Sequence, residues 1–377
     1  MSMLVYIVVQ TAIGGRIMLK IKKSGLFASI IAFSIVLTGC AMGGEQAVRQ
    51  MEDTTPQEVT YVDEETLQEN TSSAEQLENS EEEVAADTVS RELFLLDKNG
   101  YVVPQTVTLP KTKEVAKQAL EYLVEGGPIS ELLPNGFRAV LPAGTMVNGV
   151  NLLSDGTLVV DFSKEFQNYN AEDEMKILQA ITYTLTQFDT VNRVKIQING
   201  YDQTNMPVNG TPINEGTSRA NGINFDNGEV VDVVNSKAVT LYFLAQNGDN
   251  TYYVPVTRRI DKNEENNYAA IVNELIKGPN IVSGLYSELH DDIALLEAPS
   301  YENGIVTLNF NEGILSSKQG TALSQNILNE LVFSLTEQDG VESVAIKING
   351  EEKVMSELGA EISAPVSRPK SVNTGSL

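Results

Sequence analysis

The heptad "VKIQING" at residues 194–200 returns as "VAIKING" at residues 344–350. In both copies apolar residues alternate with more polar ones, which is typical of a strand that buries one face. Asn-Gly ends each heptad and favours a tight turn. The residues that the two heptads share are packing and turn residues. The repeat therefore predicts the last strand of a module that is present twice, and it indicates architecture rather than an active centre.

The elements before the heptad are also duplicated. The first copy opens with "ELFLLD" at residues 92–97, and the second opens with "AVTLYFL" at residues 238–244. In each copy a second short apolar run follows, and then a helix whose apolar residues recur with a period of 3.6. Gly126–Pro128 and Gly278–Pro279 supply the residues that end these helices.

Each copy continues with two strands, a longer helix and the heptad. Gly156 and Gly304 stand where the turn between the two strands needs a positive φ. The apolar stripe of the longer helix in the first copy comprises Ile177, Leu178, Ile181, Leu185 and Phe188. The resulting order predicts an α+β fold, a two-layer α/β sandwich with tandem βαββαβ modules that each carry an extra N-terminal strand. The crossovers predict one mixed sheet per copy, with both helices on one face.

Composition separates the chain into further parts. Between residues 41 and 90 there are fourteen acidic residues and one basic residue, so this segment cannot bury enough apolar surface to fold and is expected to be a tether. The net charge of -25 argues against nucleic acid as a partner, because phosphate binding needs clustered cations. We expect a signal peptide at 1–39, the tether at 40–90, modules at 91–220 and 237–368, a linker at 221–236 and a loose tail at 369–377.

The N-terminal residues indicate export. Lys20–Lys23 contains three lysines, and an apolar stretch at residues 25–36 follows that is short for a transmembrane helix. "LTGC" at residues 37–40 comes next, and the whole resembles a bacterial lipoprotein signal. That resemblance implies cleavage before Cys40 and a lipid anchor, such as palmitate, on its sulfur. Met18 is the start that would place the lysines next to the initiator. The alternative is an uncleaved anchor helix with Cys40 as a bystander.

Few residues could support chemistry. His290 with Asp291 and Asp292 provides too few ligands for a metal site, and the chain has no G-x-S-x-G element for a serine hydrolase. Asp161 is the strongest candidate for a glycosidase carboxylate, but the second copy has Asn309 there. The alternative is that both residues lie on an exposed strand face or hold turns. We therefore predict no catalytic, metal-binding or cofactor-binding residue and no enzyme.

Together these features resemble a known family. The signal "LTGC", the acidic tether and two copies of the pattern ending in "TLTQF…V.I.ING" resemble the GerM-type lipoproteins of sporulation and spore germination, which carry two GerMN domains. The second copy departs from the pattern with "LTEQD" in place of "LTQFD". The resemblance implies modules like the ring-building motifs of secretion machines, and a protein held on the extracytoplasmic face of the cell membrane.

The function that this resemblance implies is a non-enzymatic scaffold. It would help to build or localise an extracytoplasmic complex between mother cell and forespore during sporulation, with later effects on germination. Its partners would be other sporulation membrane proteins, and self-association is an option. The alternative is a protein that binds or processes peptidoglycan, such as that of the spore cortex. Fold-level analogy carries no site chemistry.

Overall fold

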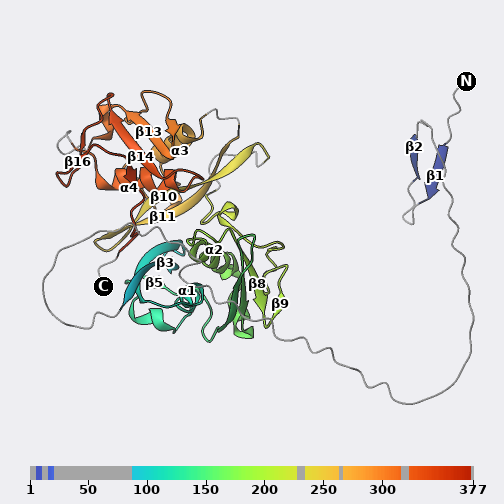
Figure 1. Ribbon diagram of the computed structural model, residues 1–377. Helices are drawn as coiled ribbons and strands as arrows, with labels where there is room; N and C mark the ends of the chain where they lie inside the picture. The colour runs from blue at the N-terminus through green and yellow to red at the C-terminus, as the bar shows by residue number, and fades with distance from the viewer. Residues whose placement is uncertain are drawn as a thin grey trace, which may run out of the picture. The chain divides into compact units, whose positions relative to one another are not determined.

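The computed structural model describes residues 6–10, 16–20, 87–226, 234–262, 266–315 and 322–374. The N-terminal unit contains one antiparallel pair of strands, β1 (Tyr6–Gln10) and β2 (Arg16–Lys20). Cys40 and the tether up to residue 86 lie outside the described residues. Both modules belong to the second unit (Figure 1).

The two modules repeat one order of elements. The first module comprises β3 (Thr88–Asp97), β4 (Val102–Pro110), α1 (Val115–Glu121), β5 (Phe137–Arg138), β6 (Val147–Leu152), β7 (Thr157–Phe162), α2 (Glu174–Leu185), β8 (Arg193–Ile198) and β9 (Tyr201–Asp202). The second comprises β10 (Ser236–Asn247), β11 (Asn250–Asp261), α3 (Asn267–Lys277), β12 (Ser300–Glu302), β13 (Ile305–Phe310), α4 (Gln325–Thr336), β14 (Ser343–Ile348), β15 (Val354–Met355), β16 (Glu361–Ile362) and β17 (Val366–Ser367). The duplicated βαββαβ order with an extra first strand is confirmed.

The strands of each copy form separate sheets. The opening strands pair as antiparallel hairpins, β3 with β4 and β10 with β11. The later strands form mixed sheets in the orders β6-β7-β8-β9 and β12-β13-β14-β17, in which β7–β8 and β13–β14 are parallel. The prediction of one mixed sheet per copy is therefore wrong, because the hairpin does not join the sheet that contains the heptad.

The longer helix explains this separation. Ten of the twelve residues of α2 are buried, so the helix is covered on more than one face. It packs against the heptad strand β8 and also against β3 of the hairpin. A helix side chain accepts a hydrogen bond from the backbone at the edge of the hairpin: the Phe94 N–H donates to Thr184 Oγ1 at 3.0 Å. In the second copy the Tyr242 N–H donates to Ser334 Oγ at 2.9 Å. A helix hydroxyl therefore takes the place of a neighbouring strand.

The repeated heptads lie in matching surroundings. Each pairs in parallel register with the strand before the long helix, Val194 with Leu158 and Val344 with Val306. Asn199 and Asn349 have φ values of 50° and 52°, a conformation that Asn tolerates better than most residues. Because pairing and turn geometry agree, the heptad is the same structural element in both copies.

Candidate functional site

Asp161 and its counterpart Asn309 hold the turns that end the heptads. Asp161 Oδ1 accepts a hydrogen bond from the Gly200 N–H at 2.8 Å, and Asn309 Oδ1 accepts one from the Gly350 N–H at 2.9 Å. An amide oxygen can accept this bond as a carboxylate does, which explains why one copy has Asp and the other Asn. The interpretation of both residues as turn residues is confirmed.

His290 and its acidic neighbours do not converge on a site. His290 Nδ1 lies 3.8 Å from Asp292 Oδ2, and the two side chains are 52% and 93% exposed. The described part of the chain contains no group of three or more His, Cys, Asp or Glu side chains that could hold a metal ion. Solvent at such exposed groups screens their interaction, so His290 and Asp292 do not form an enclosed site.

The predicted lipid attachment at Cys40 lies outside the described residues and stays a prediction. Within the residues that the structure describes, no helix has the length and hydrophobicity needed to cross a bilayer.

A cluster of charges joins the two modules. Arg219 Nη1 donates to Glu337 Oε1, and Arg368 Nη1 lies 3.4 Å from Glu337 Oε2. The Tyr242 hydroxyl also donates to Oε2 at 3.3 Å. The Glu337 side chain is only 7% exposed. Burial opposes its ionisation, but the two arginines outweigh burial and hold the pKa of Glu337 below its usual value.

The two arginines occupy equivalent places. The Arg219 guanidinium lies 4.7 Å from the centre of the Tyr183 ring, and that of Arg368 lies 5.0 Å from the centre of the Phe333 ring. Such stacking of a cation on a ring is itself favourable. Each arginine follows a serine, at residues 218–219 and 367–368. The sequence analysis missed this role, although the repeated Ser-Arg pair was a signal that could have revealed it.

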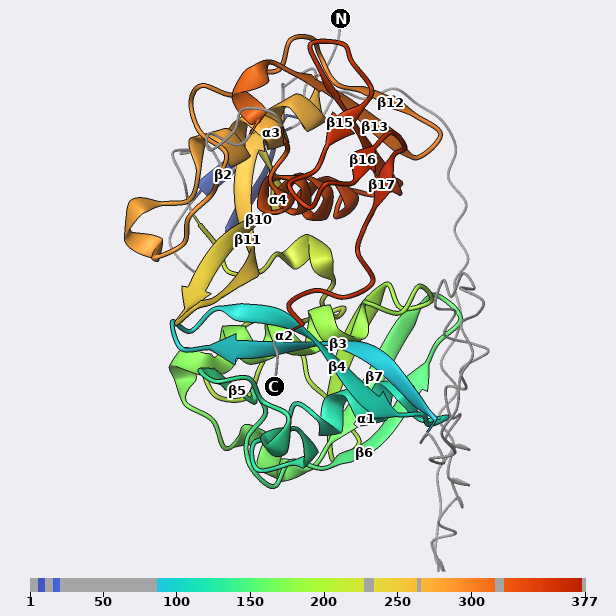
Figure 2. The ribbon, with the colours of Figure 1, turned by 90° about the vertical axis from the view of Figure 1, so that its left-hand side faces the viewer.

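The segment after each Ser-Arg pair crosses to the other copy. The Ile223 N–H donates to the Thr257 hydroxyl of β11, and the Thr257 N–H donates to the Ile223 carbonyl, both at 2.8 Å. Val372 forms three hydrogen bonds with Thr106 of β4, and Val372 is only 1% exposed. Figure 2 shows the C-terminal segment running from β17 to the β3–β4 hairpin. The expectation of a loose tail at 369–377 is therefore wrong for Val372 and Asn373, because hydrogen bonds to the two hairpins hold both residues and Val372 is buried.

Two asparagines complete this exchange. Asn224 and Asn373 both have a positive φ, 45° and 53°. Each side chain accepts from one backbone N–H and donates to two carbonyls, so that it bonds one strand from each module. The bonded residues are Val102 and Pro255 for Asn224, and Tyr253 and Pro104 for Asn373. The contact is reciprocal, as in the isologous interface of a symmetric dimer.

Two cavities beside this junction occupy related positions but differ in chemistry. One of about 380 Å³ is polar and includes Gln105, Asn135 and Asp249. The other, of about 220 Å³, includes Val256, Phe225 and Leu285. Gln105 and Val256 follow the same Tyr-x-Val-Pro phrase in their strands. The cavity beside Val256 is therefore the more apolar of the two.

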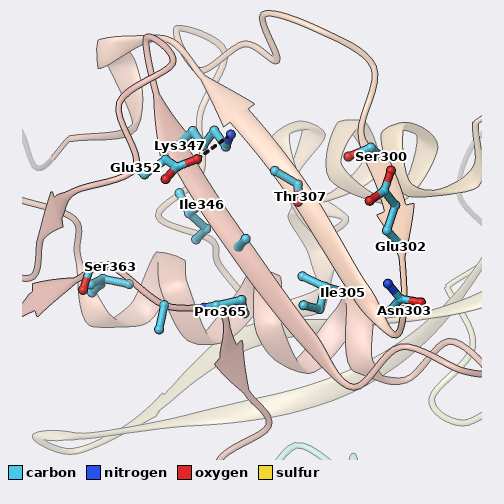
Figure 3. Close-up of a pocket in the computed structure, with 13 residues that line it drawn as sticks. Ser300, Glu302, Asn303, Ile305, Thr307, Ile346, Lys347, Glu352, Ser363 and Pro365 are labelled. Atoms are coloured by element: carbon cyan, nitrogen blue, oxygen red, sulfur yellow. Dashed lines mark ion pairs between the residues drawn. The ribbon is translucent and has the colours of Figure 1, made fainter.

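A third cavity of about 320 Å³ lies on the outer side of the second module's mixed sheet (Figure 3). Its lining includes Thr307 of β13, Ile346 and Lys347 of β14, and Pro365. Lys347 Nζ lies 2.9 Å from Glu352 Oε1 across its upper end. The lining thus combines hydroxyl, carboxylate and amine groups with apolar side chains.

The comparisons with known proteins agree with this architecture. The family model described as "Sporulation and spore germination" matches residues 92–204 and again residues 240–354. The spore germination protein GerM of Bacillus subtilis (strain 168) is 46% identical over 369 residues, which cover 96% of this chain and all of that protein.

One solved structure shows the same tandem arrangement. The tandem GerMN domains of the sporulation protein GerM from Bacillus subtilis superpose with a TM-score of 0.72 at 52% identity, and the match covers 76% of this chain and all of that one. The first GerMN domain of that protein is 62% identical over 35% of this chain and 98% of its own, with a TM-score of 0.34. Matched twice by the family model and along nearly its whole length by a relative, this chain belongs to the Germane family of sporulation and spore germination proteins, with two GerMN domains in tandem.

Proposed function

We propose that this protein is a non-enzymatic scaffold, anchored to the membrane by lipid, that helps to assemble an extracytoplasmic complex between mother cell and forespore. Its partners would be other membrane proteins of sporulation. The family of the chain supports a role in sporulation and germination. The arrangement of the described residues supports the finer statement that this role is assembly.

The observation that carries the proposal is that the two modules share core and turn residues but differ in their surface residues. Residues common to both copies, such as Asn199 and Asn349, fill cores or form turns, whereas surfaces diverge. Two and three residues after the Gly-Pro that follows α1 stand the exposed polar residues Ser130 and Glu131. The residues at the same distance from the Gly-Pro that follows α3 are Ile281 and Val282, which are 98% and 90% exposed. Duplicated frameworks with different outer surfaces suit a protein that binds other proteins.

The anchor in this proposal is Cys40. One acyl chain gives only marginal attachment to a membrane, and two or more give stable attachment. The acidic tether would hold the modules away from an anionic bilayer. Cys40→Ser should therefore release the protein into the soluble fraction of sporulating cells, as measured by fractionation and immunoblotting. Retention of the variant on membranes without other proteins would contradict the anchor.

Crosslinking in sporulating cells tests the assembly role. A photo-crosslinking residue at Ile281 should capture membrane proteins of the sporangium, while the same residue at buried Ile129 should not. A chain that stays monomeric and captures nothing from any surface position would contradict the proposal. The peptidoglycan alternative predicts instead that purified chain digests or retains peptidoglycan, and that Asp161→Asn or His290→Ala abolishes any digestion.

A further inference from the structure

The polar cavity of about 380 Å³ lies where segments of both modules meet. Its walls include residues 134–137 of the first module, residues 247–252 around the turn from β10 to β11, and Asn373 and Thr374. Figure 2 shows that the β10–β11 hairpin meets the β3–β4 hairpin there. Ligand pockets in proteins have volumes of roughly 300–1,000 Å³, so the cavity is large enough for a small molecule.

Gln105 of β4 presents a buried amide to this cavity. The residue is only 2% exposed and belongs to the cavity lining. Its side-chain amide forms no hydrogen bond with another residue that the structure describes. A buried amide without a partner is unfavourable. A molecule inside the cavity is therefore expected to form hydrogen bonds with Gln105.

The second copy shows that the fold does not need an amide at this position. Gln105 and Val256 each follow the Tyr-x-Val-Pro phrase in β4 and β11. Val256 is 3% exposed, so a valine packs well at this place in the repeated framework. Burial of an amide there is unfavourable unless the amide is hydrogen-bonded. The presence of Gln105 therefore indicates binding rather than packing.

Hydrogen bonds fix the walls of the cavity. Asn247 joins the two modules, because its Nδ2 donates to the Asn135 carbonyl and its Oδ1 accepts from Lys98 Nζ at 3.0 Å. The Tyr252 hydroxyl donates to Asp97 Oδ2 at 2.8 Å. Since these groups already bond one another, a ligand would not need to order them, and less binding free energy is lost.

The lining favours a neutral ligand that is rich in hydroxyl groups. No Lys, Arg or His stands among the described residues of the lining, which disfavours phosphate and other anions. Asp249 is the only carboxylate among them, too few for a divalent cation. The side chains of Asn135 and Asn250 form no hydrogen bond with another described residue. Amides both donate and accept, as hydroxyl groups require.

We propose that this cavity binds a neutral saccharide of one or two sugar rings, whose hydroxyl groups bond the side chains of Gln105, Asn135 and Asn250. The half-buried Phe137 packs edge-on against Tyr252, with 5.2 Å between the ring centres. An aromatic ring in the lining can pack against the apolar C–H groups of a sugar. The inference goes beyond the proposed assembly function and does not depend on it.

The test uses the purified full chain and three neutral probes, the trisaccharides chitotriose, cellotriose and maltotriose. In isothermal titration calorimetry at least one of them should bind with a Kd below about 1 mM. The bound sugar should also slow amide hydrogen exchange at residues 134–137 and 247–252. If none of the three binds at concentrations up to about 10 mM, the cavity holds only water and the proposal is overturned.

Two further probes test the class of ligand. N-acetyl-triglycine amide is a neutral peptide of similar size, and inorganic phosphate is a small anion. Each should bind at least about tenfold more weakly than the best trisaccharide. Equal affinity for the peptide would show that the cavity recognises amide groups, and equal affinity for phosphate would show that it recognises charge. Either result would overturn the saccharide proposal.

Gln105→Val tests the location. The variant gives β4 the residue that β11 has at Val256, so the module should fold, and it removes the buried amide. Trisaccharide affinity should fall about tenfold. Thr108→Val, at an exposed position of the same strand, is the matched control and should leave affinity unchanged. Equal affinity of Gln105→Val and wild type would place the sugar elsewhere and overturn the proposal.

Asn135→Ala is a second variant that does not alter a strand or a buried residue. Asn135 is exposed, and only its backbone carbonyl holds Asn247. Trisaccharide affinity should fall about threefold, and Asn151→Ala, which removes an exposed amide from β6, should leave it unchanged. If Gln105→Val does not fold, this pair decides the proposal, and equal affinities of the two variants would overturn it.

Discussion

The two modules have the same fold, but the residue after the long helix makes different contacts in each. Gln187 at the end of α2 bonds the backbone of its own hairpin, donating to the Glu92 carbonyl at 2.8 Å and accepting from the Glu92 N–H at 3.1 Å. Its counterpart after α4 is Glu337, which instead binds an arginine from each module. The hydroxyl contacts of Thr184 and Ser334 remain the same. The two copies thus share the contacts that build each module, and an amide in one copy and a carboxylate in the other at the helix end separate a contact within one module from a charged link between both.

The largest effect should follow from a charge in either core. Leu185 and Leu335 are equivalent and fully buried. Leu185→Asp should cost several kcal/mol and unfold the first module, because an unpaired charge loses its hydration there. Leu335→Asp should do the same to the second module. Since the crossing segments bond the modules to each other, each variant should lower the stability of both.

Thermal unfolding followed by circular dichroism checks this prediction. Asn151→Asp, at an exposed position of β6, serves as the control and should leave the curve unchanged. A curve for Leu185→Asp that matches the wild type would mean that the face of α2 is misassigned. Two separate transitions in the wild type would show that the junction does not couple the modules.

The charged link itself should have the next largest effect. Glu337→Gln makes the two copies alike at this position and removes the carboxylate that forms ion pairs with both Arg219 and Arg368. Removing one partner of a buried ion pair costs about 3–5 kcal/mol. The two arginine side chains are 31% and 25% exposed, so we expect about 2 kcal/mol after screening by solvent.

Urea unfolding at neutral pH measures this loss, and exposed Glu342→Gln is the matched control. The sign of the pH dependence follows from the lowered pKa of Glu337. Its contribution is present above the usual carboxyl pKa of 4.5 and is lost as pH falls through the lower folded value. The difference between wild type and Glu337→Gln should therefore shrink in acid. A difference that is constant with pH would argue against the ion pairs.

Local features of the fold could be predicted from the sequence, whereas contacts between distant residues could not. Turn glycines and the apolar stripe of α2 were found because φ preference and periodicity are local properties. The second buried face of α2 was missed because Tyr183 and Thr184 are not a simple apolar stripe. Their role depends on Phe94, which is distant in sequence, through a ring pair at 5.3 Å and a hydrogen bond. Asn224 and Asn373 were placed in a linker and a tail because hydropathy cannot reveal an amide that bonds distant backbone.

The second module has a buried carboxyl on its long helix at a position where the first module has none. Glu330 of α4 is fully buried and its Oε1 has no hydrogen-bond partner, whereas the first copy has Ala180 there. Burial raises the pKa of Glu330 to about 8, and nearby Glu288 adds to the effect. A raised pKa means that stability is greatest below the unfolded value of 4.5 and declines as pH rises towards 8.

The decline is at most about 1.4 kcal/mol per pH unit. Glu330→Gln keeps the volume but cannot ionise, so unfolding free energy measured between about pH 5.5 and about 8 should vary less steeply than in the wild type. The variant isolates Glu330 from Glu92, whose pKa burial also raises. Identical slopes for the two proteins would show that Glu330 is already ionised or hydrated.

The smallest effect is expected at the turn beside the heptad. Asp161→Asn gives the first copy the residue of the second, and the amide oxygen can still accept from the Gly200 N–H. Stability should change by less than about 0.5 kcal/mol, as at a surface position. Asp161→Ala and Asn309→Ala remove the acceptor and should each cost about 1 kcal/mol. If Asp161→Asn cost as much as Asp161→Ala, the negative charge rather than the hydrogen bond would hold the turn, and the equivalence of the two heptads would fail at this residue.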